Sequence, residues 1–193
     1  MTKIIVDLFN KLLDLFLQYQ KETTEIYHPV SETSFKFIPS PNYNTSIYRK
    51  IKYIIVHATE SDSADGTVSW FTDTKSQVSA HYMIDKLGNT IQFVHDQDVA
   101  WHADPAEWNG DKLMNTHSLG IELVNKNDNK DPFPILQVDV LLGLCKLLCV
   151  KYNVGPECVL RHRDIAPGRK TDTELNFPWE EFKKCLSDLL KKN

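Results

Sequence analysis

Residues 52–57 read Lys-Tyr-Ile-Ile-Val-His, and this run decides the fold class. Its β-branched residues, bounded by polar ones, predict a buried β-strand. His57 stands at the carboxyl end of this strand, where a side chain is held rigidly and can still face a cleft. Downstream, residues 158–161 read as a second short strand, which delivers His162 in the same manner.

Strand-like and helix-like segments are mixed along the rest of the chain. Segments 79–86 and 90–94 flank Leu87-Gly88-Asn89, a hairpin signal, and segments 99–102 and 118–124 add two more short strands. Apolar residues recur at helical spacing over 138–152 and 179–190. This mixture predicts an α/β fold in which helices flank a central mixed β-sheet.

Composition and charge narrow the class of protein. The 193 residues suffice for one domain with a short appendage, and 41% hydrophobic with 25% charged residues is typical of a globular chain. A net charge of −4 argues against a nucleic-acid partner. No run of about 18 apolar residues is present, so the sequence predicts no transmembrane segment.

The N-terminal segment differs from the rest. Residues 1–20 combine a wide apolar face with polar residues every three to four positions, which predicts an amphipathic helix. It would contact its own domain, a second copy of the chain in a homodimer, or a membrane surface. Polar residues interrupt it, so it does not read as a signal peptide. We expect a Pro-rich connector over 21–50 and the main domain over 51–193.

The four cysteines carry no metal-binding or redox motif. Cys145, Cys149, Cys158 and Cys185 form neither a CxxC pair nor a zinc-knuckle spacing. We expect reduced residues that act as small hydrophobes, which favours a reducing compartment. A Cys149–Cys158 disulfide is the alternative.

Segment 162–172, HRDIAPGRKTD, contains side chains that can bind a metal ion. Its Pro167-Gly168 turn lets the chain fold back, so that Asp172 can approach His162. Together with His57 this makes two imidazoles and one carboxylate, a three-ligand zinc site with an open fourth position. Zinc lowers the pKa of bound water to about 7 and polarises a carbonyl, which suits amide hydrolysis. The alternative is that His57 and His162 are ordinary core histidines.

A joint pattern of motifs decides against that alternative. The same segment occurs with IIVHAT (54–59), VSAHYMID (78–85), LGNTIQFV (87–94), AWHA (100–103) and NTHSLGIEL (115–123). In this order the motifs resemble the zinc-dependent N-acetylmuramoyl-L-alanine amidases of the amidase type 2 family, which is related to phage lysozyme-amidases and peptidoglycan-recognition proteins. The resemblance covers about residues 39–182 and looks closest to the AmpD and AmiD branch.

The resemblance implies specific roles for residues of the site. It implies one zinc ion per chain, held by His57, His162 and Asp172. It points to Glu122, in the GIEL segment, as the general base. Lys170, two residues before Asp172, would stabilise the oxyanion of the transition state. Trp101, His102, Asn115, His81 and Tyr82 would line the cleft and bind substrate, although Asn115 could instead structure its loop.

The function implied is hydrolysis of the amide between N-acetylmuramic acid, in its anhydro or ordinary form, and L-alanine of peptidoglycan stem peptides. The partners would be peptidoglycan fragments or muropeptides, in cell-wall degradation or recycling. A non-catalytic muropeptide-binding module is the rival, but it would be expected to lack a ligand. The cysteines and the N-terminal segment favour a cytoplasmic location, with the cell envelope as the alternative.

Overall fold

A computed structural model describes residues 35–46 and 48–192. The helix predicted over 1–20 and its proposed contacts, together with the first part of the connector, lie outside the described residues. Among the helices described, none combines the length and the apolar character needed to cross a membrane.

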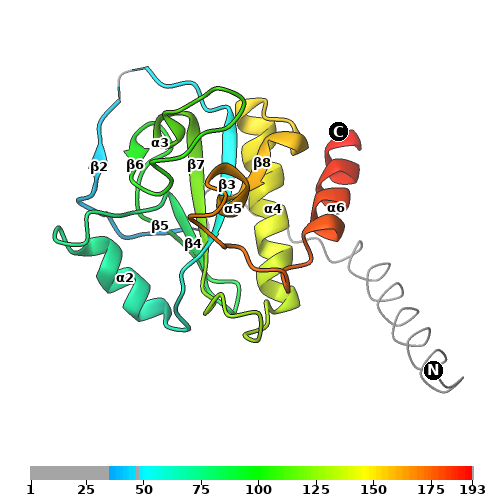
Figure 1. Cartoon of the computed structure of the whole chain (residues 1–193), viewed down its shortest axis with the longest axis horizontal. Coiled ribbons are helices and arrows are strands. Elements are labelled where there is room, and N and C mark those ends of the chain that lie inside the picture. The colour runs from blue at the N-terminus through cyan, green and yellow to red at the C-terminus, as the bar shows by residue number, and fades with distance from the viewer. Residues whose placement is uncertain (1–34, 47, 193) are drawn as a thin grey trace, which may run out of the picture.

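Six strands form one sheet, in the order β1-β5-β4-β7-β3-β8 (Figure 1). Along the described sheet, neighbouring strands pair in parallel except for β4 and β5, which are antiparallel. The mixed sheet predicted from the sequence is therefore confirmed. The strands are β1 (Lys36–Phe37), β5 (Thr90–Gln92), β4 (Tyr82–Ile84), β7 (Ser118–Leu123), β3 (Tyr53–Ala58) and β8 (Val159–Arg161).

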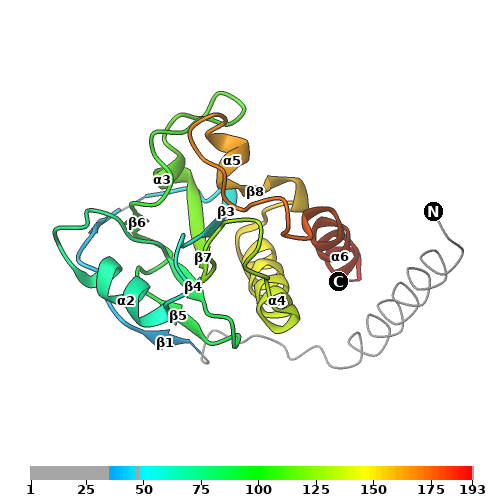
Figure 2. The ribbon, with the colours of Figure 1, turned by 60° about the horizontal axis from the view of Figure 1, so that its bottom comes forward.

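Helices cover both faces of this sheet (Figures 1 and 2). Helices α4 (Ile135–Tyr152) and α6 (Trp179–Lys191) pack on one face, where they bury Ile54 and Val56 of β3. Helices α2 (Ala64–Thr72), α3 (Met114–His117) and α5 (His162–Ile165) lie on the other face. Because β3 is buried on both faces, its sequence is a continuous apolar run rather than an alternating one.

The helix ends follow local rules. Asn153 caps the carboxyl end of helix α4: it adopts the left-handed conformation at φ 53° and donates its backbone N–H to the Cys149 carbonyl. A 3₁₀ turn, η2 (Pro156–Cys158), then leads into β8. Both long helices match the spans predicted from their apolar periodicity.

Strand β7 separates the core from the cleft. Leu119, Ile121 and Leu123 enter the core beneath α4, so Ser118, Gly120 and Glu122 face the other way. Glu122 therefore lies on the face opposite the three aliphatic residues, as the alternation predicts.

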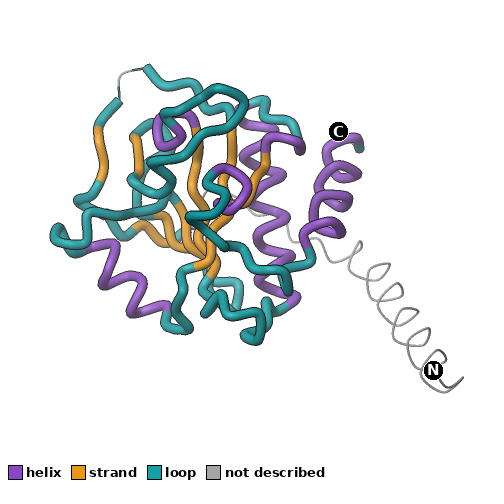
Figure 3. The backbone as a smooth tube through the Cα atoms, in the orientation of Figure 1, coloured by secondary structure: helices purple, strands orange, loops and turns teal. Residues whose placement is uncertain are grey.

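Two parts of the chain depart from the sequence predictions (Figure 3). In the segment predicted as a connector, β1 pairs with β5, and β2 (Tyr43–Asn44) pairs with β6 (Val99–Ala100). The described part of that segment is thus hydrogen-bonded into the sheets and is not a free linker. The strand predicted over 79–86 is regular only at 82–84, although the His81 N–H still donates to the Gly120 carbonyl of β7; further back, the Ser79 N–H donates to the Trp101 carbonyl.

Candidate active site

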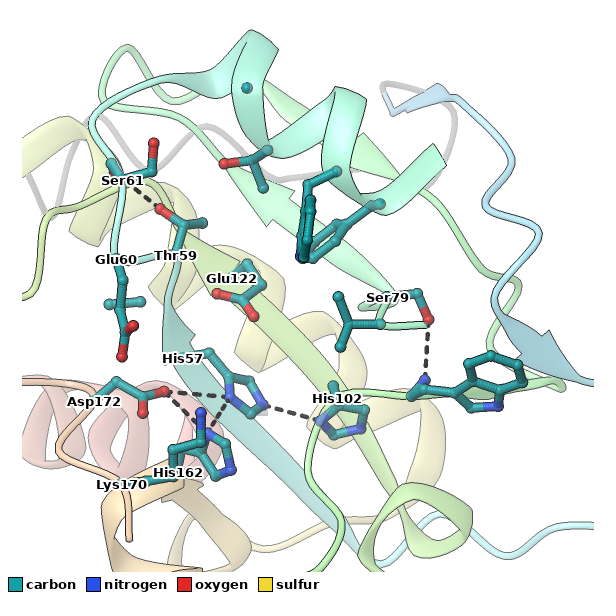
Figure 4. A pocket seen from close by; sticks show the side chains of 17 residues that line it. His57, Thr59, Glu60, Ser61, Ser79, His102, Glu122, His162, Lys170 and Asp172 are labelled. Carbon is teal, nitrogen blue, oxygen red and sulfur yellow. Dashed lines mark hydrogen bonds and ion pairs between the residues drawn. The ribbon is translucent and has the colours of Figure 1, made fainter. Parts of the chain in front are cut away.

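A cavity of about 450 Å³ opens at the carboxyl ends of β3 and β7. This is the edge of a parallel sheet where ligands bind in α/β proteins, because the strand ends and their loops diverge there. Its walls include the three residues predicted as zinc ligands, the two predicted catalytic residues, and residues of helix α2. Figure 4 shows these side chains converging on one space.

His57, His162 and Asp172 form a buried cluster that can hold a metal ion. His57 Nδ1 lies 2.9 Å from His162 Nδ1 and 3.4 Å from Asp172 Oδ2, and the third side, His162 Nδ1 to Asp172 Oδ2, is 3.2 Å. These separations suit three ligand atoms that each lie about 2.0–2.2 Å from one ion.

The chain brings the three ligands together from three places. His57 is the last residue but one of β3, and His162 begins helix α5 directly after β8. Asp172 returns through a turn in which Gly168 adopts φ 76°, and its backbone carbonyl accepts from Arg163 N–H at 2.8 Å. The fold-back predicted from Pro167-Gly168 is present.

Electrostatics favour the protonation states in which His57 and Asp172 bind a metal ion. Burial, helped by the nearby His162, lowers the pKa of His57 to about 4, so its imidazole is neutral near pH 7. Burial alone would raise the pKa of Asp172, but its close contacts with His162 and His57 outweigh burial and hold that pKa well below its usual range. Neutral imidazole and ionised carboxylate are the forms that bind metal.

Two unpartnered carboxylate oxygens show that the donor set fits a metal ion. Among the described residues, Asp172 Oδ1 and Glu122 Oε2 are buried side-chain oxygens without a hydrogen-bond partner. Buried carboxylate oxygens ordinarily find a partner, so a cation or its bound water at this place would satisfy them. Two imidazoles and a carboxylate that leave open positions are a donor set that fits zinc.

Glu122 stands beside the cluster on the neighbouring strand. It is the register partner of His57 in the parallel pairing of β3 with β7. Burial, together with the negative charge of Asp172, raises the pKa of its carboxyl to about 8, while the positive charge of Lys170 opposes this. Lys170 lies on the other wall of the cavity, next to His162 in Figure 4.

The residues predicted to bind substrate separate into two groups. Trp101 and His102 line the cavity, and the Trp101 indole N–H donates to Asn44 Oδ1 at 2.6 Å. Asn115 does not line the cavity: its Oδ1 accepts from the backbone N–H groups of His102 and Ala103 at 3.0 and 2.7 Å. This geometry favours the loop-structuring alternative for Asn115.

His81 and Tyr82 also lie away from the cavity. His81 is buried behind His102, and its Nδ1 accepts from the Gly120 backbone N–H at 3.0 Å. Tyr82 points to the opposite face of the sheet, where its hydroxyl donates to Asp96. The physical reason is strand alternation, since Tyr82 pairs with Ile121 and shares its core-facing side.

Sequence reasoning missed the wall made by helix α2. Thr67 and the 57%-exposed Trp70 line the cavity, as do Thr59 and Glu60 at the end of β3. A signal was present, because Ser63 caps the helix by accepting from Gly66 N–H and Val68 and Phe71 are spaced to pack on the sheet.

At its carboxyl edge the mixed sheet carries a His-His-Asp cluster that can hold a metal ion, with a carboxylate beside it, which defines the class as an α/β domain with a candidate metal site. The chain belongs to the N-acetylmuramoyl-L-alanine amidase family, Amidase_2, whose model matches residues 47–174. The family resemblance seen in the sequence is thus confirmed.

Individual relatives agree with this assignment. The chain is 35% identical to N-acetylmuramoyl-L-alanine amidase AmiD of Escherichia coli K12 over 149 residues, 70% of this chain and 53% of that protein. It is 34% identical to 1,6-anhydro-N-acetylmuramyl-L-alanine amidase AmpD of Haemophilus influenzae over 107 residues, 55% of this chain and 57% of that one. The chain thus spans little more than half the length of these curated relatives.

Solved structures share the fold. A crystal structure of an AmpD derivative superposes with a TM-score of 0.71 at 25% identity, covering 80% of this chain and 96% of that one. A structure of E. coli AmiD in complex with the substrate anhydro-N-acetylmuramic acid-L-Ala-D-γ-Glu-L-Lys gives a TM-score of 0.66 at 32% identity, covering 72% and 59%.

Proposed function

We propose that this chain is a zinc-dependent N-acetylmuramoyl-L-alanine amidase. It hydrolyses the amide that joins the lactyl group of N-acetylmuramic acid to L-alanine of a peptidoglycan stem peptide. The observation that carries the proposal is the buried His57–His162–Asp172 cluster with Glu122 at its side in an open cavity. Family membership and the substrate named for the AmiD structure support it.

His57, His162 and Asp172 would hold the zinc ion. When bound there, zinc supplies Lewis acidity toward a carbonyl oxygen and makes water a better nucleophile near pH 7. The cluster leaves room on its cavity side for the substrate carbonyl and the water.

Glu122 would transfer a proton, and Lys170 would stabilise the negative charge of the transition state. A cation bound at the cluster would lower the raised pKa of Glu122 and keep its carboxylate ionised. Glu122 then takes a proton from the attacking water as the new C–O bond forms, and it returns that proton to the nitrogen as the C–N bond breaks. The Lys170 ammonium stabilises negative charge on the former carbonyl oxygen. The products are a free lactyl carboxylate and a stem peptide with a free amino terminus.

Trp101 and His102 would contact the substrate along the cavity wall. We place the protein in the cytoplasm, where it would act on soluble muropeptides; the anhydro substrates named for AmpD and for the AmiD complex support the anhydro form as one of them. Cys149 and Cys158 are thiols and do not form a disulfide, and Cys145 and Cys149 lie in the apolar core, as expected of residues in a reducing compartment.

The test is product analysis by mass spectrometry. The zinc-loaded chain, incubated with an anhydro-muropeptide, should release the intact stem peptide, and a chelator should stop the release. The Glu122→Gln variant is the matched control, because it should bind the muropeptide without cleaving it. Binding by the wild type with no release would make the chain a binding module instead.

A further inference from the structure

His102 contacts the proposed ligand His57 on the side that faces away from His162 and Asp172. Its Nδ1 lies 2.9 Å from His57 Nε2, and the dashed line in Figure 4 marks this contact. The other nitrogen of His57, Nδ1, is the one that faces His162 and Asp172. The two nitrogens of His57 therefore face two different environments.

A chain of hydrogen bonds sets the direction of this contact. The Met114 carbonyl can only accept, so the Ser118 hydroxyl, 2.5 Å away, donates its one proton to it. Ser118 Oγ then faces His102 Nε2, 3.3 Å away, as an acceptor, which places the His102 proton on Nε2.

The rest of this series of hydrogen bonds follows from the chemistry of imidazole. A neutral ring protonated at Nε2 has a bare lone pair at Nδ1. His102 Nδ1 must therefore accept from His57 Nε2–H. This leaves the lone pair of His57 on Nδ1, directed at the space between His162 and Asp172. Each donor in the series meets an acceptor, from the Met114 carbonyl to the metal site.

Strand β7 is built to accommodate the His102 ring. A Cβ at Gly120 would lie 2.6 Å from His102 Cγ and Nδ1, closer than such atoms approach in proteins. Ser118, Gly120 and Glu122 alternate on the cleft face of β7. The strand thus presents in turn the hydroxyl that anchors His102, the space for its ring, and the proposed base.

We propose that His102 is a positioning residue that fixes the tautomer and ring orientation of His57, with Ser118 as its anchor and Gly120 as the space for its ring. The inference rests on the proposed metal site and gives His102, beside its place in the cavity wall, a second role that acts through His57. Partners that hold a metal-binding histidine in this way typically change metal affinity about 10–100-fold when removed.

Zinc affinity, measured by competition with a chromophoric chelator, tests the proposal without any use of activity. His102→Leu removes the acceptor and should weaken zinc binding by about 10–100-fold. His102→Asn keeps an amide oxygen near the position of Nδ1 and should recover most of that loss. His95→Leu is the matched control, because His95 is exposed and stacks on Phe37, outside this chain of hydrogen bonds.

Equal zinc affinity in the wild type and His102→Leu would overturn the proposal while leaving the proposed function in place. Loss in the Asn variant as large as in the Leu variant would also overturn it, since the acceptor atom would then be irrelevant. Wild-type protein that binds no zinc would instead remove the proposed function.

A spectroscopic measurement on the wild type does not depend on any variant. Long-range ¹H–¹⁵N NMR correlations of the histidine rings identify which nitrogen carries the proton. We expect His102 and His57 both to be protonated at Nε2, with and without zinc. A His102 ring protonated at Nδ1 would overturn the inference whatever the zinc affinities show.

Discussion

His57 and Glu122 are register partners at the carboxyl ends of the adjacent parallel strands β3 and β7. The backbone ladder therefore holds a proposed metal ligand beside the proposed base, with a strand separation of about 4.8 Å. Because the ladder, and not a bond between the two side chains, sets this geometry, replacing one side chain leaves the other in place. The roles of the two residues can thus be separated by mutation.

The Glu122→Gln variant keeps the shape of the side chain but cannot accept a proton. We expect zinc content and muropeptide affinity to be retained, and the rate to fall by about 10²-fold or more. Steady-state kinetics together with metal analysis measures both. The control is Glu180→Gln on the exposed surface of α6, which should behave as the wild type. Turnover of the Glu122 variant within a few-fold of wild type would make Glu122 structural.

The Lys170→Ala variant removes a cation from the cavity wall. An interaction that strengthens as charge develops in the transition state should appear in kcat rather than in KM. We expect kcat to fall by about 10²-fold with zinc content unchanged. Lys170→Arg should recover only part, because a planar guanidinium does not replace a compact ammonium. Lys184→Ala, on the exposed part of α6, is the control; a large rise in KM with normal kcat would assign Lys170 to substrate binding instead.

The His162→Ala variant removes one of the three ligands. We expect zinc to be lost on dialysis and activity with it, because two remaining ligands do not hold the ion. The fold should survive with a moderately lower melting temperature, since the hydrophobic cores do not depend on the site. Metal analysis and thermal unfolding measure the two effects, with the exposed His95→Ala as control. Full zinc occupancy in the His162 variant would refute the ligand set.

Asp96 gives a prediction about stability on the opposite face of the sheet. Its carboxylate, 6% exposed, accepts from Tyr82 at 2.5 Å, Tyr152 at 2.6 Å and Lys151 at 3.1 Å. Burial alone would raise the pKa of this carboxyl, but the three donors outweigh it and lower the pKa below its usual value. We expect Asp96→Asn to lower the free energy of unfolding at pH 7 by about 2–3 kcal/mol.

The pH dependence of this loss has a definite sign. A carboxyl whose pKa in the folded state lies below its unfolded value of about 3.9 stabilises the fold fully when the pH is above about 3.9. This contribution is lost as the pH falls through the folded-state pKa. The difference between wild type and Asp96→Asn should therefore shrink below about pH 4. Urea unfolding at pH 7 and pH 3 checks this, with the exposed Asp65→Asn as control. A difference that stays constant with pH would show that shape, and not charge, matters at Asp96.

Sequence alone was enough to predict the mixed α/β sheet, the two long helices and the return of Asp172 to His162. Each has a local cause: the β-branched run of β3, the apolar period of α4, and the Pro167-Gly168 turn that returns Asp172 to His162. Strand alternation also placed Glu122 on the face away from the aliphatic core. Patterns of this kind depend on neighbours close in the chain, so they can be read without the fold.

Only the tertiary structure decided which other residues meet at the site. Tyr82 lies outside the cavity because its pairing with Ile121 directs its side chain to the core. The side chain of Asn115 instead accepts a hydrogen bond from the backbone of the loop at His102. The pairing of His57 with Glu122, and the contact of His102 with His57 over Gly120, join segments 45 to 65 residues apart. No local pattern specifies such long-range contacts, because they depend on strand order and register, which the packing of the whole sheet determines.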